Sequence, residues 1–169
     1  MTVHRTRPLP VRPSRGSLIV AEQVVQSSAR LLRAPRHQRE ERLVFWLGRN
    51  VDADTIVVSV CAPTTRNGPG GVFYDELGMG DAATAARTQR LGIVTQVHTH
   101  PGTDTRHSDG DDDLALMPYE GMFSLVIAEY GRGSLLPGEG AGLHQYQDGQ
   151  WIQVANEPAA LVIVPEILR

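Results

Sequence analysis

The sequence contains little cysteine and no long apolar run. Its single cysteine, Cys61, rules out an intramolecular disulfide and a tetrathiolate zinc site, and it fits a reducing compartment. No apolar run approaches the roughly 18 residues that a membrane-spanning helix needs, and the first residues lack the apolar stretch of about 7 to 15 residues that marks a secretory signal. We therefore expect a soluble, cytoplasmic protein with no membrane partner.

Length and composition indicate one ordinary globular domain. A chain of 169 residues suits a single domain, which should bury about 70% of the surface that its unfolded chain exposes. Apolar residues make up 41% of the chain and charged residues 21%, a mixture that argues against wholesale disorder. The net charge of -3 argues against nucleic acid or an anionic membrane as the main partner.

Positive charge and proline gather at the start of the chain. The first residues include four arginines and no acid, with prolines between them: Arg5, Arg7, Arg12, Arg15, Pro8, Pro10 and Pro13. This composition predicts an extended, solvated and partly disordered tail over 1–16, ahead of a domain at 17–169. A basic docking arm is the functional alternative for the same segment.

Hydrophobic periodicity predicts alternating strands and helices. We expect helices at 22–33, 82–91 and 109–117, strands at 17–20, 43–47, 55–60, 93–97 and 122–129, and a hairpin at 146–151. Asp81 is the expected cap of the second helix, and the glycine-rich stretches 64–80 and 131–142 favour loops. The fold class is therefore α/β or α+β, in a single domain.

Two histidines and an aspartate have the spacing of a metal site. His98 and His100 follow a predicted strand and point to one face, because side chains alternate along a strand. Ser108 and Asp111 lie three residues apart at the start of a predicted helix and also share a face. Two imidazoles and one carboxylate form a catalytic zinc set that leaves the fourth position for water.

A zinc-bound water also needs a base that does not itself bind the metal. Glu41 is the best candidate, because it precedes a strand that could lie next to the metal-bearing strand, whereas Glu40 would point to the opposite face. The hydroxyl of Ser108 could donate a hydrogen bond to the oxyanion that forms when water attacks a carbonyl.

These residues resemble the motif of the JAMM (MPN+) metalloproteases. The likeness spans roughly residues 17 to 155 and rests on Glu41, Gly48, His98-x-His100-Pro101, the seven residues that separate His100 from Ser108, and Ser108-x-x-Asp111. It implies an MPN fold of the cytidine-deaminase-like type, with a mixed β-sheet flanked by helices. Two departures, Val44 where glycine is common and Val94–Val97 where aromatic residues are common, concern the subfamily.

The resemblance also implies roles and partners. It makes His98, His100 and Asp111 the Zn²⁺ ligands, Glu41 the residue that activates water, and Ser108 the group that stabilises the tetrahedral intermediate. The implied activity is hydrolysis after the C-terminal Gly-Gly of a ubiquitin-like protein or its conjugates. The setting would be bacterial deconjugation or precursor processing, including antiviral defence, with activating and conjugating enzymes of the same pathway as further partners.

Substrate contacts and alternative functions complete this interpretation. The stretch 64–80 is a candidate clamp on the diglycine tail, so we expect contacts from Gly70 and Gly71, together with Thr99 and Pro101. The alternatives are a protease that matures a sulfur-carrier protein, a DNA-repair-associated JAMM-like protein, and a scaffold without catalysis.

Each element also has a simpler interpretation. Ser108 to Asp111 fits a capping box, and a calcium loop starting at Asp109 lacks the glycine that its sixth position needs, because Leu114 stands there. We expect His107 to be an exposed loop histidine, Cys61 a buried structural thiol and Trp46 a core residue.

Overall fold

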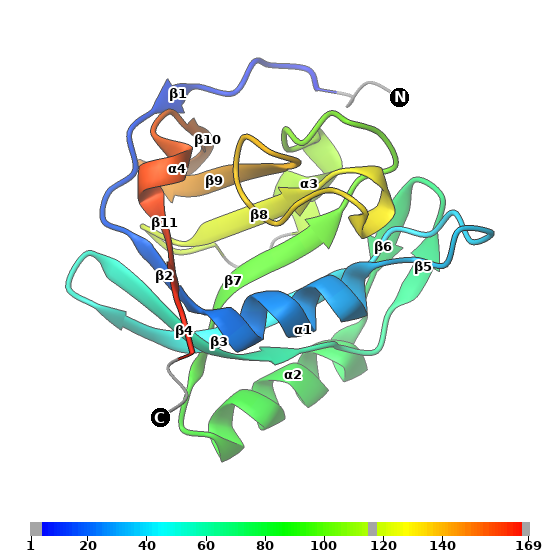
Figure 1. The fold of residues 1–169 in the computed structure, drawn as a ribbon, viewed down its shortest axis with the longest axis horizontal. Helices are drawn as coiled ribbons and strands as arrows, with labels where there is room; N and C mark the ends of the chain where they lie inside the picture. The colour runs from blue at the N-terminus through cyan, green and yellow to red at the C-terminus, as the bar shows by residue number, and fades with distance from the viewer. Residues whose placement is uncertain (1–4, 115–117, 167–169) are drawn as a thin grey trace.

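A nine-stranded mixed sheet organises the molecule, and the computed structural model describes residues 5–114 and 118–166 (Figure 1). The strand order is β1-β10-β9-β8-β7-β3-β4-β2-β11. The strands of this sheet are β1 (Val11–Arg12), β2 (Leu18–Ala21), β3 (Leu43–Val51), β4 (Asp54–Cys61), β7 (Gly92–Thr99), β8 (Phe123–Ile127), β9 (Ala141–Gln147), β10 (Gln150–Val154) and β11 (Leu161–Val164). The expected single domain with a mixed sheet is confirmed.

Helices lie on both faces of this curled sheet (Figure 1). They are α1 (Glu22–Leu32), α2 (Glu76–Thr88), α3 (Asp109–Leu114), α4 (Glu157–Ala160) and the 3-10 turn η1 (Glu129–Gly131). A separate hairpin is formed by β5 (Arg66–Gly68) and β6 (Gly71–Phe73). No helix within the described residues combines the length and the hydrophobicity that crossing a bilayer requires.

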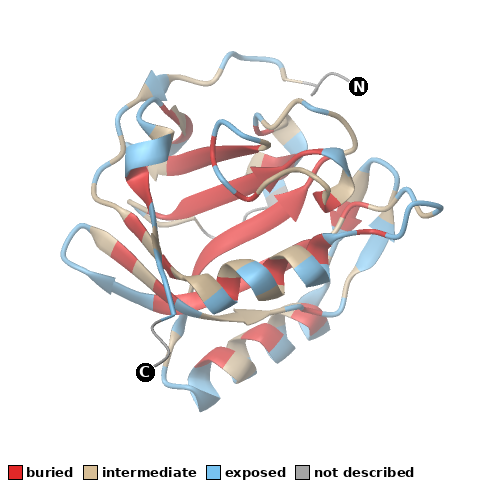
Figure 2. Cartoon of the chain, viewed as in Figure 1, coloured by how far each residue is buried: buried red, intermediate tan, exposed pale blue. Residues whose placement is uncertain are grey.

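The central strand β3 is buried on both faces, which explains its continuous apolar sequence. Val44 and Trp46 belong to the core that α1 covers, whereas Phe45 and Leu47 pack beside Ala86 of α2. Figure 2 shows the central strands as buried and the outer faces of α1 and α2 as exposed. The two helices therefore protect opposite sides of the strand that precedes the site.

Trp46 is a core residue, as predicted, and it joins β3 to α1. Its side chain is completely buried, and Nε1 donates a hydrogen bond to Ser28 Oγ at 2.7 Å. The Ser28 hydroxyl in turn donates to the carbonyl oxygen of Val24, also at 2.7 Å. Every polar atom of this contact is thereby satisfied without water.

Strand β7 contains His98, leads directly into His100, and lies between β3 and β8. It runs antiparallel to β3, with Leu43 opposite His98, and parallel to β8. Beyond the last pair, Thr99 N–H donates to the carbonyl of Arg42 at 3.0 Å, and Arg42 N–H donates to Thr99 Oγ1 at 2.9 Å. This pairing places Glu41, just before Arg42, beside the end of β7.

The structure corrects the predicted loop at 64–80 and the helix start at Asp81. The segment contains the β5–β6 hairpin, and α2 begins at Glu76 because the Asp75 carboxylate accepts from the N–H groups of Leu77 and Gly78. Gly78 lies inside the helix because a Cβ there would stand 2.3 Å from the Thr64 carbonyl oxygen. The glycines that suggested a loop thus permit close packing of a helix.

The amino-terminal segment is also different from the prediction. Residues 5–16 pack against the domain, and β1 pairs in parallel with β10, with Val11 opposite Gln153. Arg12 and Arg15 both form ion pairs with Asp148, at 2.8 and 2.9 Å. Residues 5–16 are extended, as predicted, but they bind to the domain through partners late in the chain instead of standing free in solvent.

The remaining predicted elements differ from the structure mainly at their ends. The hairpin predicted at 146–151 forms between β9 and β10, and the strands predicted at 43–47 and 55–60 pair as β3 and β4. The helix predicted over 82–91 ends at Thr88, and the strand predicted over 93–97 is longer, from Gly92 to Thr99. For the helix predicted over 109–117, α3 covers Asp109–Leu114, and 115–117 lie outside the described residues.

Candidate metal centre

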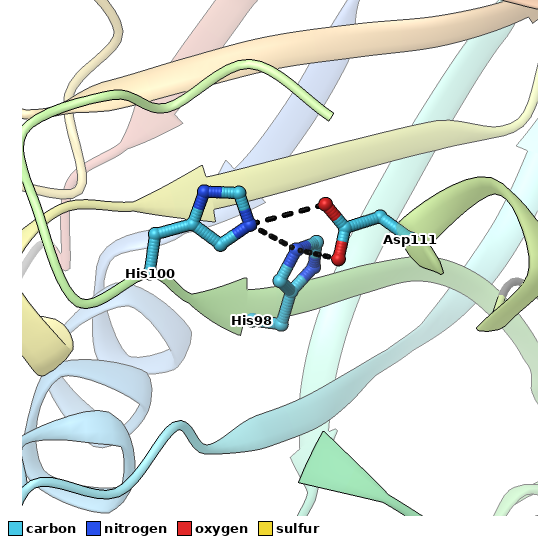
Figure 3. A group of neighbouring side chains, drawn as sticks. All are labelled: His98, His100 and Asp111. Carbon is cyan, nitrogen blue, oxygen red and sulfur yellow. Dashed lines mark hydrogen bonds and ion pairs between the residues drawn. The ribbon is translucent and has the colours of Figure 1, made fainter. Parts of the chain in front are cut away.

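Three side chains, from the carboxyl end of β7, the residue that follows it and α3, converge on one point (Figure 3). His98 Nε2 lies 3.3 Å from His100 Nε2 and 3.2 Å from Asp111 Oδ1, and His100 Nε2 lies 3.1 Å from Asp111 Oδ2. All three residues are buried. The alternation of β7 puts the two imidazoles on one face, and the chain returns through 101–108 to bring Asp111 to them.

A glycine on β9 allows this return. At Gly142, a Cβ would stand 2.5 Å from the carbonyl oxygen of Thr105, so no larger residue fits against the loop. The same loop supplies the Asp104 carbonyl, which lies 2.9 Å from His100 Nδ1. The loop therefore both directs α3 toward the histidines and orients one of them.

The hydrogen bond to Asp104 fixes which nitrogen of His100 faces the centre. A carbonyl oxygen can only accept, so Nδ1 carries the proton, and Nε2 of the neutral ring presents a lone pair. That lone pair faces the Asp111 carboxylate and the Nε2 of His98. A cation at this buried point, either a proton on His100 or a metal ion, would be stabilised by these groups.

The geometry fits a divalent metal ion. A tetrahedral zinc ion with bonds of about 2.0–2.1 Å holds its ligand atoms about 3.3 Å apart. The separations here are 3.1 to 3.3 Å. Among the described residues, His98 Nδ1 is buried without a hydrogen-bond partner, so packing and the contacts of Nε2 orient that ring. The group can therefore hold a metal ion with few changes in position.

Burial and charge shift the pKa values of these groups in the metal-free protein. Burial lowers the pKa of His98. Burial also disfavours the charged form of His100, but the Asp111 carboxylate outweighs it and raises the pKa of that imidazole. The pKa of Asp111 falls well below its usual range, because the two histidines outweigh the desolvation of its carboxylate. Asp111 is therefore a carboxylate at neutral pH, ready to bind a cation.

Glu41 lies beside this group and is almost completely buried. Burial raises the pKa of Glu41 to about 7, with the positive charge of His100 opposing and the negative charge of Asp111 adding to the shift. Its backbone N–H donates to the carbonyl of Gly68 at 2.8 Å, which ties it to the β5–β6 hairpin. A carboxyl group that titrates near neutral pH is suited to accepting and returning a proton.

Ser108 and Asp111 form the capping box at the start of α3. The N–H of Ser108 donates to Asp111 Oδ2 at 2.6 Å, and the N–H of Asp111 donates to Ser108 Oγ at 3.1 Å. The box holds the Asp111 carboxylate in place, so Asp111 can cap the helix and still face the two histidines. The Ser108 hydroxyl accepts in this box and keeps its own proton for another acceptor. The alternative of a calcium loop is wrong, since Asp109–Leu114 is helical.

The four residues expected to contact substrate differ in accessibility. Thr99 is completely buried, and its hydroxyl is bonded to Arg42, so its side chain cannot reach a substrate. Pro101 is half-buried beside His100. Gly70 is exposed and Gly71 half-buried in the β5–β6 turn. Thr99 therefore positions the strand, while the other three remain accessible.

Sequence reasoning missed a second polar group behind the first. His107 is completely buried, not an exposed loop histidine, and its ring contacts that of His98 with centroids 5.8 Å apart. Its Nδ1 lies 3.1 Å from Asp112 Oδ1, and its Nε2 lies 2.9 Å from Ser124 Oγ. Asp112, His107 and Ser124 are ordered like a catalytic triad, but the Ser124 hydroxyl cannot attack a substrate, because Ser124 is completely buried.

The second group has partners far along the chain. The rings of His107 and His144 stack with centroids 4.2 Å apart, and Arg5 reaches Asp112 from the amino-terminal arm. The sequence gives no local signal for these contacts. Cys61, expected to be buried, is half-buried at the end of β4.

Comparisons with known proteins show the fold. No family model and no curated protein matches the chain. A protein of Desulfitobacterium hafniense, DSY2949, solved in solution, matches with a TM-score of 0.66 and 17% identity over 89% of this chain and 94% of its own. AF2198 of Archaeoglobus fulgidus, a JAB1/MPN domain protein, matches with a TM-score of 0.49 and 10% identity over 88% of this chain and 97% of its own. The first likeness shows a shared fold.

Proposed function

We propose that the protein is a zinc-dependent peptidase of the JAMM (MPN+) type, built on an MPN fold. The observation that carries this proposal is the convergence of His98, His100 and Asp111, with separations that suit a tetrahedral ion. Glu41 lies close enough to this group that the charges of His100 and Asp111 shift the Glu41 pKa. These four residues and Ser108 are the positions that resemble the family motif.

Each residue of the site would have a separate role in peptide-bond hydrolysis. When bound, a zinc ion supplies Lewis-acid activation of a water molecule and of a carbonyl oxygen. Glu41 takes a proton from the attacking water and later gives it to the departing amine. The Ser108 hydroxyl donates a hydrogen bond to the carbonyl oxygen as negative charge develops there. The Asp104 carbonyl keeps His100 in the tautomer that binds metal.

The β5–β6 hairpin supports a narrow, extended substrate. It is tied to the site by the bond from Glu41 N–H to Gly68, and the Tyr130 hydroxyl donates to the carbonyl of Pro69 at 3.1 Å. A short strand edge beside a catalytic base favours a peptide that adds as a further strand and lacks bulky side chains. The C-terminal Gly-Gly tail of a ubiquitin-like protein meets both requirements.

With this substrate, the protein would act in a pathway that attaches ubiquitin-like proteins to their targets. It would release a ubiquitin-like protein from a conjugate or trim its precursor, alongside activating and conjugating enzymes, for example in bacterial antiviral defence. Maturation of a sulfur-carrier protein uses the same diglycine end and is the second candidate. A precursor with a short peptide extension and a lysine-linked conjugate distinguish the two, because only deconjugation requires cleavage of the isopeptide.

The test combines these substrates with a matched variant. Zinc-loaded protein should cleave a Gly-Gly fusion, and a chelator should abolish the cleavage. Glu41→Gln, which keeps the size of the side chain, should lower the cleavage rate by about 100-fold to 10,000-fold while zinc stays bound. Cleavage that persists after metal removal, or a Glu41→Gln variant with the parent's rate, would contradict the proposal.

A further inference from the structure

The amino-terminal arm reaches the helix that supplies the aspartate of the metal centre. The arm, dark blue in Figure 1, crosses from β1 toward α3. Its first described residues bind the first turn of α3, more than a hundred residues later in the chain. This contact brings the amino-terminal arm beside the helix that supplies Asp111.

Arg5 makes three hydrogen bonds at this contact. Its Nη1 donates to the carbonyl oxygens of His107 at 3.2 Å and Ser108 at 3.3 Å, and its Nη2 donates to Asp112 Oδ2 at 2.9 Å. The guanidinium is largely buried, with 17% of the side chain exposed. Planar, charge-assisted bonds of this kind fix direction as well as distance.

The contact continues into the sheet. The second oxygen of Asp112 faces His107 Nδ1 at 3.1 Å, and His107 Nε2 faces the hydroxyl of Ser124 on β8 at 2.9 Å. Arg5 therefore begins a buried series of bonds that passes through the first turn of α3 and ends on the strand next to β7. Thr6 adds a bond to the same turn, from its N–H to Asp109 Oδ2 at 2.8 Å.

Helix α3 needs such support, because it is short. Six residues form too little helix to be stable alone, so partners outside the helix must set its direction. The capping box holds the N–H side of its first turn, through Ser108 and Asp111. Arg5 binds the carbonyl oxygens of His107 and Ser108, the two residues just before the helix.

We propose that Arg5 is a positioning residue of the metal centre, which fixes Ser108 and Asp111 relative to the histidines of β7. The inference rests on the proposed metal site but not on the substrate. Ligands must be held within about 0.5 Å of their working positions, so a loosened α3 weakens metal binding even when the fold is intact. The arm thus acts on the site through α3 and touches no ligand atom itself.

Metal affinity tests this role directly. Zn²⁺ is titrated into the full-length metal-free protein in competition with a chromophoric chelator, and Co²⁺ is added separately to record its visible spectrum. Arg5→Ala should weaken Zn²⁺ binding about tenfold, the low end of the loss found for groups that support metal ligands. Arg5→Lys, which keeps the charge but not the planar fork, should fall between Arg5→Ala and the parent.

Two variants in the same arm provide controls. Arg7→Ala removes an exposed arginine, and Arg12→Ala removes the ion pair with Asp148 that anchors β1. Both should bind Zn²⁺ within about twofold of the parent, because single surface charges and exposed ion pairs contribute little. Thermal unfolding of the metal-free variants separates a loss of fold from a loss of positioning.

The outcomes separate this inference from the proposed function. Weaker metal binding in Arg5→Ala alone, with an altered Co²⁺ spectrum and a folded metal-free protein, supports the positioning role. Parent-like binding in Arg5→Ala, or an equal loss in Arg12→Ala, overturns it and leaves the metal centre intact. A parent protein that binds neither ion overturns both.

Discussion

Two histidine groups lie against each other in this protein, and their hydrogen bonding differs. In the first, Nε2 of His98 and of His100 face each other and the Asp111 carboxylate. In the second, both ring nitrogens of His107 face ordinary partners, Asp112 and Ser124. The first group can hold a metal ion, whereas both ring nitrogens of His107 have their partners within the protein.

The comparison shows that neighbours, not residue type, decide what a buried histidine does. The Asp104 carbonyl uses up the one proton of neutral His100 and leaves a lone pair inside. At His107, a hydroxyl that can donate or accept completes the bonding instead. We therefore expect the first group to control metal binding and the second to control stability.

The largest effect should follow loss of a ligand. His98→Ala removes one of three protein donors, so its Zn²⁺ affinity should fall by more than the roughly 100-fold expected for a supporting residue. His144→Ala, a matched change in the second group, should retain bound Zn²⁺. Competition titration measures both, and equal losses in the two variants would erase the distinction between the groups.

Loss of His107 should act on the folded state. His107→Ala leaves a cavity and removes the partner of the buried Ser124 hydroxyl and one partner of Asp112, so the free energy of unfolding should fall by about 2–4 kcal/mol. Zinc affinity should fall no more than about tenfold, because the ligands remain. Denaturant unfolding of the metal-free protein checks the first value, and a change smaller than about 1 kcal/mol would show that these bonds contribute little.

A smaller, pH-dependent effect is expected at Glu41. Its pKa in the folded, metal-free protein is about 7, raised by burial from 4.5. The folded state binds this proton more tightly than the unfolded state, so the stabilisation is full below about pH 4.5 and is lost as pH rises through about 7. The Glu41→Gln variant lacks this titration.

This difference can be measured as a pH profile of stability. At pH 8 the metal-free Glu41→Gln protein should be more stable than the parent by about 1–3 kcal/mol, and the two should converge near pH 4. A parent profile parallel to that of Glu41→Gln would show that the Glu41 carboxyl ionises normally.

Local patterns in the sequence predicted the residues of the site but not its surroundings. Side-chain alternation put His98 and His100 on one face, and the capping box placed Ser108 and Asp111 together, because both patterns depend on neighbours within a few residues. The burial of Thr99 was missed, since it depends on pairing with Arg42 from another strand.

The same reason explains the errors in secondary structure. Gly78 signals a loop by composition, but it lies within α2 because the helix packs closely against the backbone of Thr64. The composition of the arm that contains Arg5 signals disorder, but Arg5 is bound by Asp112 and by the carbonyls of His107 and Ser108. In both cases a contact between distant segments outweighs a local preference.

The amino-acid sequence by itself determined the single mixed domain, the alternation of strands and helices, and the identity of the side chains that can meet around a cation. The tertiary structure alone decided that a second, buried histidine group lies behind the first, that a hairpin borders Glu41, and that the amino-terminal arm holds α3. Periodicity and capping act over one or two turns of chain, whereas these arrangements depend on hydrogen bonds and packing between residues that only the folded sheet brings together.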